Sequence, residues 1–150
     1  MDQKHVVVPA AYVFLEREDG ACLFLRRQGT DYMPGKYQMP SGHVEANEMP
    51  SEAAVRETKE EVGVDIDPSD LELIHTSYRI TGGERDRVDF FYRTKKWSGE
   101  VQNMEPHKCD DLHWTSMTNL HEDTVPVVRV VIEYILEGKT HSEILTPKSS

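Results

Sequence analysis

The stretch GHVEANEMPSEAAVRETKEEVG, residues 42–63, carries six glutamates in little more than twenty residues. Residues from about 50 to 62 predict a helix, because Pro50 suits a first helical turn and Gly63 a C-terminal stop. Three of the glutamates would share one face of that helix: Glu57, Glu60 and Glu61. Like charges three or four residues apart destabilise a helix by about 0.2–0.5 kcal/mol per pair, which indicates a compensating cation.

The same helix has an apolar stripe that predicts contact with a core. At about 100° per residue, four side chains fall within about 100° of arc: Ala54, Val55, Thr58 and Val62. The three glutamates fill a neighbouring arc, and three other side chains are expected to point away from both: Arg56, Lys59 and Glu52. Hard carboxylate oxygens suit Mg²⁺ or Mn²⁺, so the sequence predicts a divalent metal site beside a buried face.

An acidic helix face of this kind is usually solvated, but its spacing here is specific. Residues 42–64 follow a 23-residue frame of Gly, five residues, Glu, seven residues, Arg-Glu, an aliphatic residue, one residue, Glu-Glu, one residue, Gly and an aliphatic residue. Eight of the nine defined positions match. The exception is Thr58, whose γ-methyl can still pack and whose hydroxyl can bond the carbonyl four residues back. On this frame, the Nudix box, the chain resembles the Nudix hydrolase family, although Ser41 stands where the family often has a glycine.

The resemblance extends less specifically over residues 5–138. It implies an α/β fold, the Nudix α/β/α sandwich with a mixed β-sheet, in one domain (1–150) whose core spans about 5–138 and whose tail is 139–150. Family members cleave a nucleoside diphosphate linked to a moiety X by attack of water at phosphorus. The resemblance further implies that three carboxylates bind the metal: Glu57, Glu60 and Glu61. The Gly42 carbonyl would be an extra ligand. Arg56 would hold a glutamate in place, and Glu48 would be an outer ligand, a supporting residue or a substrate contact.

Two other candidate residues each have a functional and a purely structural interpretation. Glu105, in the loop NMEPHK, is either a distal ligand or general base, or a solvated loop acid. Arg26 closes a strand-like run and is either a phosphate clamp or a surface arginine. As a phosphate clamp it competes with Arg27 at the same strand end. Three further arginines lie around the glycine-rich tip TGGERD: Arg79, Arg85 and Arg87. A strand-end arginine is expected to be more rigid than one on that tip.

The rest of the chain predicts a mixed sheet covered by helices. Strands are expected at 5–16 and 22–26, a hairpin at 71–80 and 87–97, and a short strand at 110–117. Residues 28–42 are expected to be mostly loop and 123–138 a closing helix, while the tail is expected to be frayed or lightly packed.

Composition limits the function classes. Asp and Glu number 27 against 17 Lys and Arg, a net charge of −10, which disfavours duplex nucleic acid and anionic membranes as partners. The two cysteines, Cys22 and Cys109, have no zinc-site spacing. No apolar run reaches the length of a membrane helix, and the start lacks a signal-peptide pattern, so a cytoplasmic protein with two reduced thiols is expected.

The combined prediction is a pyrophosphohydrolase that depends on Mg²⁺ or Mn²⁺ and acts on a small nucleotide-like substrate. A MutT-like cleavage of a nucleoside triphosphate to monophosphate and pyrophosphate is the leading hypothesis. The alternatives are an ADP-ribose or nucleotide-sugar pyrophosphatase and a non-catalytic Nudix-fold nucleotide sensor. The complete acidic set argues against the sensor, while the base, the sugar, X and the oligomeric state stay open at this point.

Overall fold

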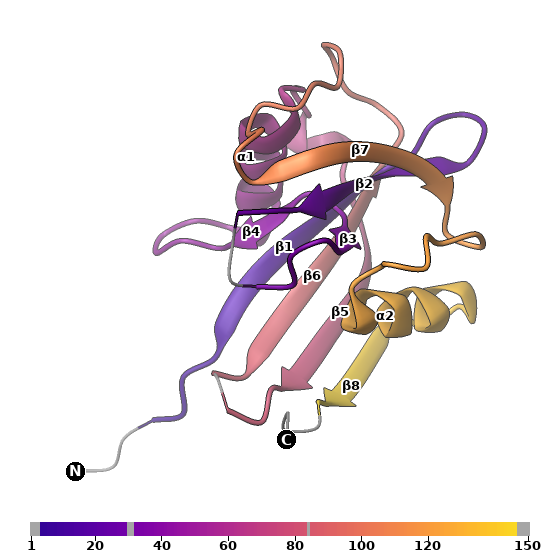
Figure 1. The fold of residues 1–150 in the computed structure, drawn as a ribbon. Coiled ribbons are helices and arrows are strands. Elements are labelled where there is room, and N and C mark those ends of the chain that lie inside the picture. Colours follow the sequence, from indigo (N-terminus) through magenta and orange to yellow (C-terminus); the bar gives the residue numbers. More distant parts are fainter. Residues whose placement is uncertain (1–3, 30–31, 84, 147–150) are drawn as a thin grey trace.

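Two β-sheets with two α-helices make up the described part of the chain, residues 4–29, 32–83 and 85–146, in a computed structural model (Figure 1). The elements are, in order, β1 (Val8–Leu15), β2 (Ala21–Arg27), β3 (Tyr37–Gln38), β4 (Ser41–His43), α1 (Pro50–Val62), a 3₁₀ turn (Pro68–Asp70), β5 (Glu72–Ile80), β6 (Arg87–Thr94), β7 (Cys109–Ser116), α2 (Pro126–Leu136) and β8 (His141–Leu145). Neither described helix is long and apolar enough to cross a membrane.

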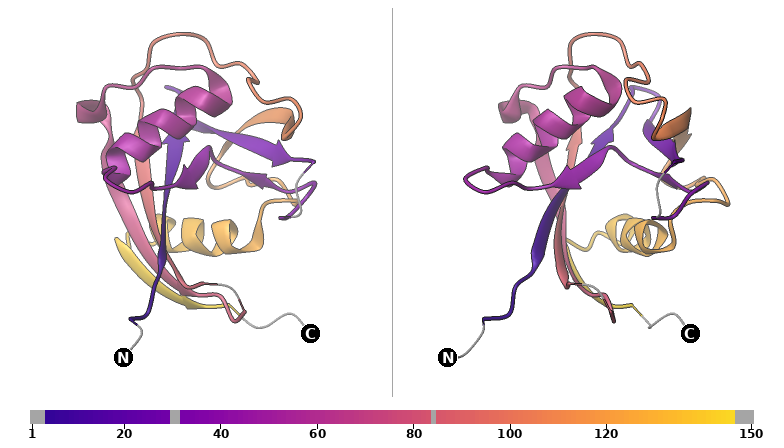
Figure 2. Two further views of the ribbon diagram at one scale, coloured as in Figure 1. Left: turned by 90° about the vertical axis from the view of Figure 1, so that its left-hand side faces the viewer. Right: turned by 60° about the vertical axis from the view of Figure 1, so that its left-hand side comes forward.

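The larger sheet is mixed, as predicted. Its strand order is β4-β1-β6-β5-β8, with β1 parallel to β6 and β5 parallel to β8, and with antiparallel pairing elsewhere. The smaller sheet, β3-β2-β7, is antiparallel. α1 and α2 lie on opposite faces of the larger sheet (Figure 2). The predicted α/β sandwich with a mixed sheet is confirmed.

The central strand β1 feeds a hydrophobic core on each side of the sheet. Successive side chains of a strand point to opposite faces. Tyr12 and Phe14 therefore pack into the core under α2, whereas Ala11, Val13 and Leu15 pack into the core under α1. Burial on both faces explains why the strand is almost continuously apolar in sequence.

α1 begins and ends where the sequence predicts. The Met49 backbone N–H donates to Glu52 Oε1 over 3.0 Å at its start, and Gly63 ends it with φ +79° while donating to the Lys59 carbonyl over 3.0 Å. Its buried residues are Ala53, Ala54, Thr58 and Val62. Three of the four predicted stripe residues are therefore buried, and Ala53 takes the place of Val55, which is only half-buried. The Thr58 hydroxyl donates to the Ala54 carbonyl over 2.7 Å, as expected.

Two irregular segments contain more regular structure than the sequence predicts. The tail from residue 139, expected to be frayed or lightly packed, is not frayed, because β8 pairs in parallel with β5 and places His141 opposite Thr76, so the sheet extends to Leu145. Its polar residues hid the alternation that buries Ser142 between two exposed neighbours; residues 147–150 of the predicted tail lie outside the described part. The described part of 28–42 is mostly loop, as predicted, apart from β3 and the start of β4, which are too short to show a period of their own.

Substitutions of Thr58 test whether its hydroxyl matters in the buried stripe. We expect Thr58→Val to change the free energy of unfolding by less than about 1 kcal/mol, because shape is kept and the Ala54 carbonyl retains its helical N–H partner. Thr58→Ser keeps the hydroxyl but loses the methyl group, and should cost more, about 1 kcal/mol. Urea unfolding of both variants measures this; a larger loss in the valine variant would assign the stability to the hydroxyl.

Candidate active site

Arg56 of α1 lies at the centre of the acidic cluster. Its Nε and Nη2 donate to the two carboxylate oxygens of Glu48 over 2.8 and 3.0 Å, a bidentate pair. Nη1 donates to Glu57 Oε1 over 2.8 Å and lies 3.5 Å from Glu60 Oε1, while Nη2 also reaches the His43 carbonyl over 3.1 Å. The prediction that Arg56 points away from the glutamates is therefore wrong. That Arg56 holds a glutamate in place for a metal ion stays a prediction, and its contact with Glu57 is the one that this role requires.

Gly42 provides the space for Glu57. The two meet where β4 pairs with β1 and passes under α1. A Cβ built on Gly42 would overlap the carboxyl group of Glu57, so no larger residue fits without moving that side chain. The glycine of the box is therefore required by the close approach of the Glu57 carboxylate to the β4 backbone.

Glu61 is the most enclosed of the three helix acids. Its Oε2 accepts the backbone N–H of Ser41 over 3.0 Å. Burial, followed by the charge of Glu57, raises the pKa of Glu61 well above its ordinary value of 4.5. Burial likewise raises the pKa of Glu57, against the influence of Arg56. Both carboxylates are thus short of positive charge, which a cation bound between them would supply.

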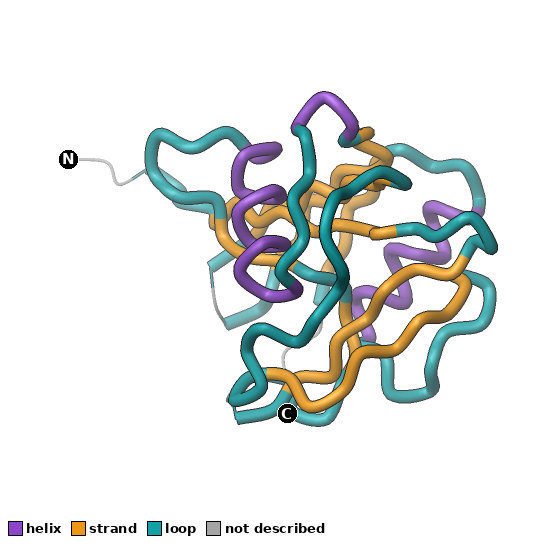
Figure 3. Tube along the Cα trace, turned by 90° about the horizontal axis from the view of Figure 1, so that it is seen from above, coloured by secondary structure: helices purple, strands orange, loops and turns teal. Residues whose placement is uncertain are grey.

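The loop between β6 and β7 brings a fourth acid to this end of α1. Backbone N–H groups of Gln102 and Met104 donate to the carbonyls of Val62 and Glu61 over 2.9 and 3.0 Å, and the loop runs beside the helix (Figure 3). Glu105 follows directly, and its charge contributes to the raised pKa values of both Glu57 and Glu61. Sequence reasoning named Glu105 without being able to show this proximity.

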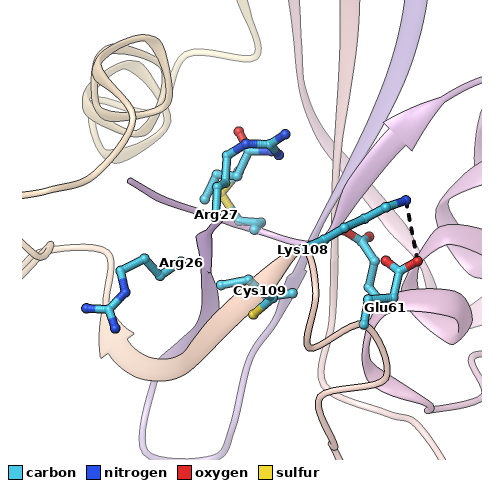
Figure 4. A pocket seen from close by; sticks show the side chains of 9 residues that line it. Arg26, Arg27, Glu61, Lys108 and Cys109 are labelled. Atoms are coloured by element: carbon cyan, nitrogen blue, oxygen red, sulfur yellow. Dashed lines mark ion pairs between the residues drawn. The ribbon is translucent and has the colours of Figure 1, made fainter. Parts of the chain in front are cut away.

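Glu61 and Glu105 face a common cavity of about 60 Å³, which has room for a few water molecules. Lys108 extends toward the acidic side of this cavity, with its Nζ 3.7 Å from Glu105 Oε2 (Figure 4). Arg26 points the other way in the same view, and its Nε donates to Asp110 Oδ1 over 2.6 Å. Its role in binding phosphate therefore stays a prediction, as does any substrate contact of Glu48, which is committed to Arg56.

The donor chemistry fits a hard divalent cation. Four glutamates and the Gly42 carbonyl offer only oxygen ligands, and Glu57 and Glu61 are buried enough to favour a compensating charge. Among the described residues, however, no three His, Cys, Asp or Glu side chains are close enough together to hold a metal ion as they stand. Glu57 and Glu60 are turned toward Arg56 instead.

A second, larger cavity adjoins the acidic site at Gly42. Its volume is about 370 Å³, and its described lining residues are Tyr12, Arg27, Tyr32, Gln38, Ser41, Gly42, His43 and Arg87. The sequence placed Arg27 at the end of a strand and Arg87 beside the tip TGGERD, without indicating that they share a cavity. Tyr12 was not identified as a site residue. The available signal was Asp89, a charged residue that stands between the apolar Val88 and Phe90 of β6 and is buried.

Comparison with known proteins establishes the family. The family model described as the NUDIX domain matches residues 6–135. The chain belongs to the Nudix hydrolase family. Members of this family of pyrophosphohydrolases generally use divalent metals such as Mg²⁺ or Mn²⁺.

Its relatives are similar in sequence and in fold. Identity is 29% over 113 residues with an 8-oxo-dGTP diphosphatase of Escherichia coli (strain K12), covering 75% of this chain and 82% of that protein. It is 39% over 71 residues with an RNA pyrophosphohydrolase of Halorhodospira halophila (strain DSM 244 / SL1), covering 47% of this chain but only 36% of that protein. A MutT NUDIX hydrolase from Burkholderia pseudomallei superposes with a TM-score of 0.77 at 22% identity, covering 86% of this chain and 98% of the other, which shows the shared fold.

Alanine at Gly42 tests the close packing in this Nudix hydrolase. We expect Gly42→Ala to displace Glu57 and to destabilise the protein by about 1–3 kcal/mol, the usual cost of overpacking. Gly83→Ala is the matched control, because a Cβ there meets no atom within 4 Å. Chemical denaturation of both variants measures the difference. Equal stability of the two would contradict the close approach of Glu57.

The bidentate ion pair predicts a pH-dependent contribution to stability. Hydrogen bonds from Arg56 and from the Glu45 N–H lower the pKa of Glu48 from its ordinary 4.5 to about 2. Because the folded-state pKa lies below the ordinary value, the stabilisation is complete above about pH 4.5 and is lost as the pH falls toward 2. Glu48→Gln should therefore lower the melting temperature at neutral pH and converge with the wild type in acid.

Glu45→Gln is the control for this series. Glu45 lies in the same segment, but its side chain is 68% exposed, against 14% for Glu48, and it is 3.7 Å from Arg56. An exposed pair at this distance contributes little, so this variant should melt close to the wild type throughout. A gap for Glu48→Gln that stays constant between about pH 7 and about pH 3 would rule out the ion pair as its source.

Proposed function

We propose that this Nudix hydrolase cleaves the phosphoanhydride of a nucleoside diphosphate linked to X with the help of Mg²⁺ or Mn²⁺. A nucleoside triphosphate, cut to the monophosphate and pyrophosphate, is the proposed preferred substrate. The observation that carries the proposal is that Glu57 packs against the backbone of Gly42, while Glu61 from the same helix and Glu105 from a distant loop line one small cavity.

Three carboxylates of α1 would hold the cation: Glu57, Glu60 and Glu61. The Gly42 carbonyl would be a further ligand. When bound, the cation supplies neutralisation of phosphate charge and activation of water. Arg56 positions Glu57 through its 2.8 Å hydrogen bond while being fixed itself by Glu48. A positioning residue held this way reduces the freedom of the ligand that it contacts.

Glu105 is the candidate general base. It is not among the described partners of Arg56, and it faces the small cavity, where a water molecule could be held between it and Glu61. The Asn103 side chain accepts the Glu105 backbone N–H over 3.1 Å, which orders the loop locally. Glu105 would accept the proton of the attacking water, and Lys108 lies beside its carboxylate with Nζ 3.7 Å from Oε2. Arg26, at the rim of the same cavity, is the proposed phosphate contact.

The proposed substrate class is supported by the relatives and by charge. The Escherichia coli relative is named an 8-oxo-dGTP diphosphatase, a name that describes action on a nucleoside triphosphate. A net charge of −10 leaves binding of an anionic nucleotide to local cations, and disfavours duplex nucleic acid and membrane surfaces. Both cysteines are free and buried, consistent with the proposed cytoplasmic location.

Phosphate-release assays over nucleoside triphosphates, ADP-ribose and nucleotide sugars test the proposal. We expect Mg²⁺-dependent turnover, strongest for a triphosphate, and a loss of at least about 100-fold in Glu61→Gln, because each ligand contributes to a charge interaction worth several kcal/mol. Without metal, Glu61→Gln should melt at or above the wild-type temperature, because a neutral amide is less costly to bury than a carboxylate.

The exposed Glu133 of α2 supplies the matched control. Glu133→Gln makes the same chemical change away from the site and should keep wild-type turnover. Retained turnover in Glu61→Gln would contradict the assignment of this carboxylate. Nucleotide binding by the wild type without turnover of any substrate would favour the nucleotide sensor.

A further inference from the structure

The larger cavity has a rigid arginine in its wall. Arg87 Nε lies 3.3 Å from Asp89 Oδ1, and Arg87 Nη2 donates to the Tyr12 hydroxyl over 3.4 Å. Tyr12 is itself fixed by stacking on Phe91, with ring centroids 4.6 Å apart and planes inclined by 17°. The Arg87 guanidinium is therefore held in place before any ligand arrives, while 20% of the side chain remains exposed.

The surroundings of this arginine carry an excess of positive charge. Asp89 also pairs with Arg79 Nη2 over 3.5 Å, so two arginines share one carboxylate. Arg79 and Asp89 are 8% and 4% exposed, and Arg79 Nε has no hydrogen-bond partner among the described residues. Arg27 adds another positive charge to the cavity wall, and none of the described residues that line the cavity is a carboxylate. Uncompensated buried charge of this kind is costly, and an anion would relieve it.

The two cavities share two lining residues. Arg27 and Gln38 line the larger cavity and also the small one that contains Glu61 and Glu105. The larger cavity also reaches Ser41 and Gly42, which contact Glu61 and Glu57. One extended ligand could thus occupy the acidic site and the arginine-lined cavity together.

We propose that the larger cavity is a subsite for a phosphate group of the substrate other than the phosphate that water attacks. The inference rests on the proposed function and adds a specificity determinant to it. A planar guanidinium that is already oriented matches phosphate oxygens with two parallel hydrogen bonds, and Arg27 can contact the same group. Such a phosphate has two chemical sources: the end of the polyphosphate chain, or a phosphate ester on the ribose.

Calorimetric titration of the full chain in EDTA separates these sources. The probes are AMP and GMP, which present one phosphate on different bases, ADP, which adds a second phosphate on the chain, and adenosine 3′,5′-bisphosphate, which adds a second phosphate on the ribose. We expect at least one of the two-phosphate ligands to bind about ten- to a hundredfold more tightly than AMP, as charge-assisted hydrogen bonds do. Arg87→Gln should abolish this gain, and the ligand that shows it identifies the source.

Arg93→Gln is the matched control on the same strand. Arg93 lies near the other end of β6, where it pairs with the exposed Glu72 over 3.1 Å, and its replacement should leave the gain intact. Because Arg87 contacts the buried Asp89, Arg27→Gln serves as a second variant, and it should also reduce the gain. Thermal melts of all variants verify folding.

Three outcomes would overturn the inference. The first is no gain in affinity over AMP for either two-phosphate ligand, and the second is a gain that survives both Arg87→Gln and Arg27→Gln. The third is an Arg87-dependent preference between GMP and AMP without any gain from a second phosphate. The last would assign the cavity to the base instead. Each outcome is read in EDTA, so it is independent of Mg²⁺-dependent turnover. An enzyme that is active on triphosphates but shows none of the expected binding gain would retain the proposed function and lose the subsite.

Discussion

The bidentate pair between Arg56 and Glu48 is the interaction on which the site depends. It ties the segment before α1 to the helix, and the same guanidinium continues to Glu57 and to the His43 carbonyl of β4. One arginine thus fixes the helix against the sheet edge that carries Gly42. It cannot also neutralise Glu61, which it is not seen to contact and whose pKa is raised by burial. A local deficit of positive charge is therefore built into the packing.

The region around Gly42 joins surroundings of opposite charge. On the α1 side stand Glu57 and Glu61, and on the other side lies a cavity with Arg87 and Arg27 in its wall. A metal-bound phosphate chain matches both surroundings, because its cation binds carboxylates and its outer phosphate oxygens accept hydrogen bonds from guanidinium groups. This division explains how a chain with a net charge of −10 can present a local site for an anion.

Local sequence spacing predicted the helix and its acids, whereas long-range contacts were beyond it. The 50–62 helix and the Thr58 hydroxyl bond follow from residues three and four apart. The pairing of β8 with β5 and the short strand β4 arise from strand register, which no single segment encodes. The direction of Arg56 was wrong because a helical wheel ignores a partner eight residues away, Glu48, that lies before the helix. The arginine-lined cavity combines β1, β2 and β6 and was invisible for the same reason.

Binding of Mn²⁺, followed by the electron paramagnetic resonance signal of the free ion, tests the central claim that the packing around Arg56 creates a cation site. The wild type should bind Mn²⁺ in the absence of nucleotide, and Glu57→Gln and Glu61→Gln should each weaken binding by at least about tenfold, while Glu133→Gln leaves it unchanged. Equal affinity in all four proteins, or no binding by the wild type, would contradict the claim.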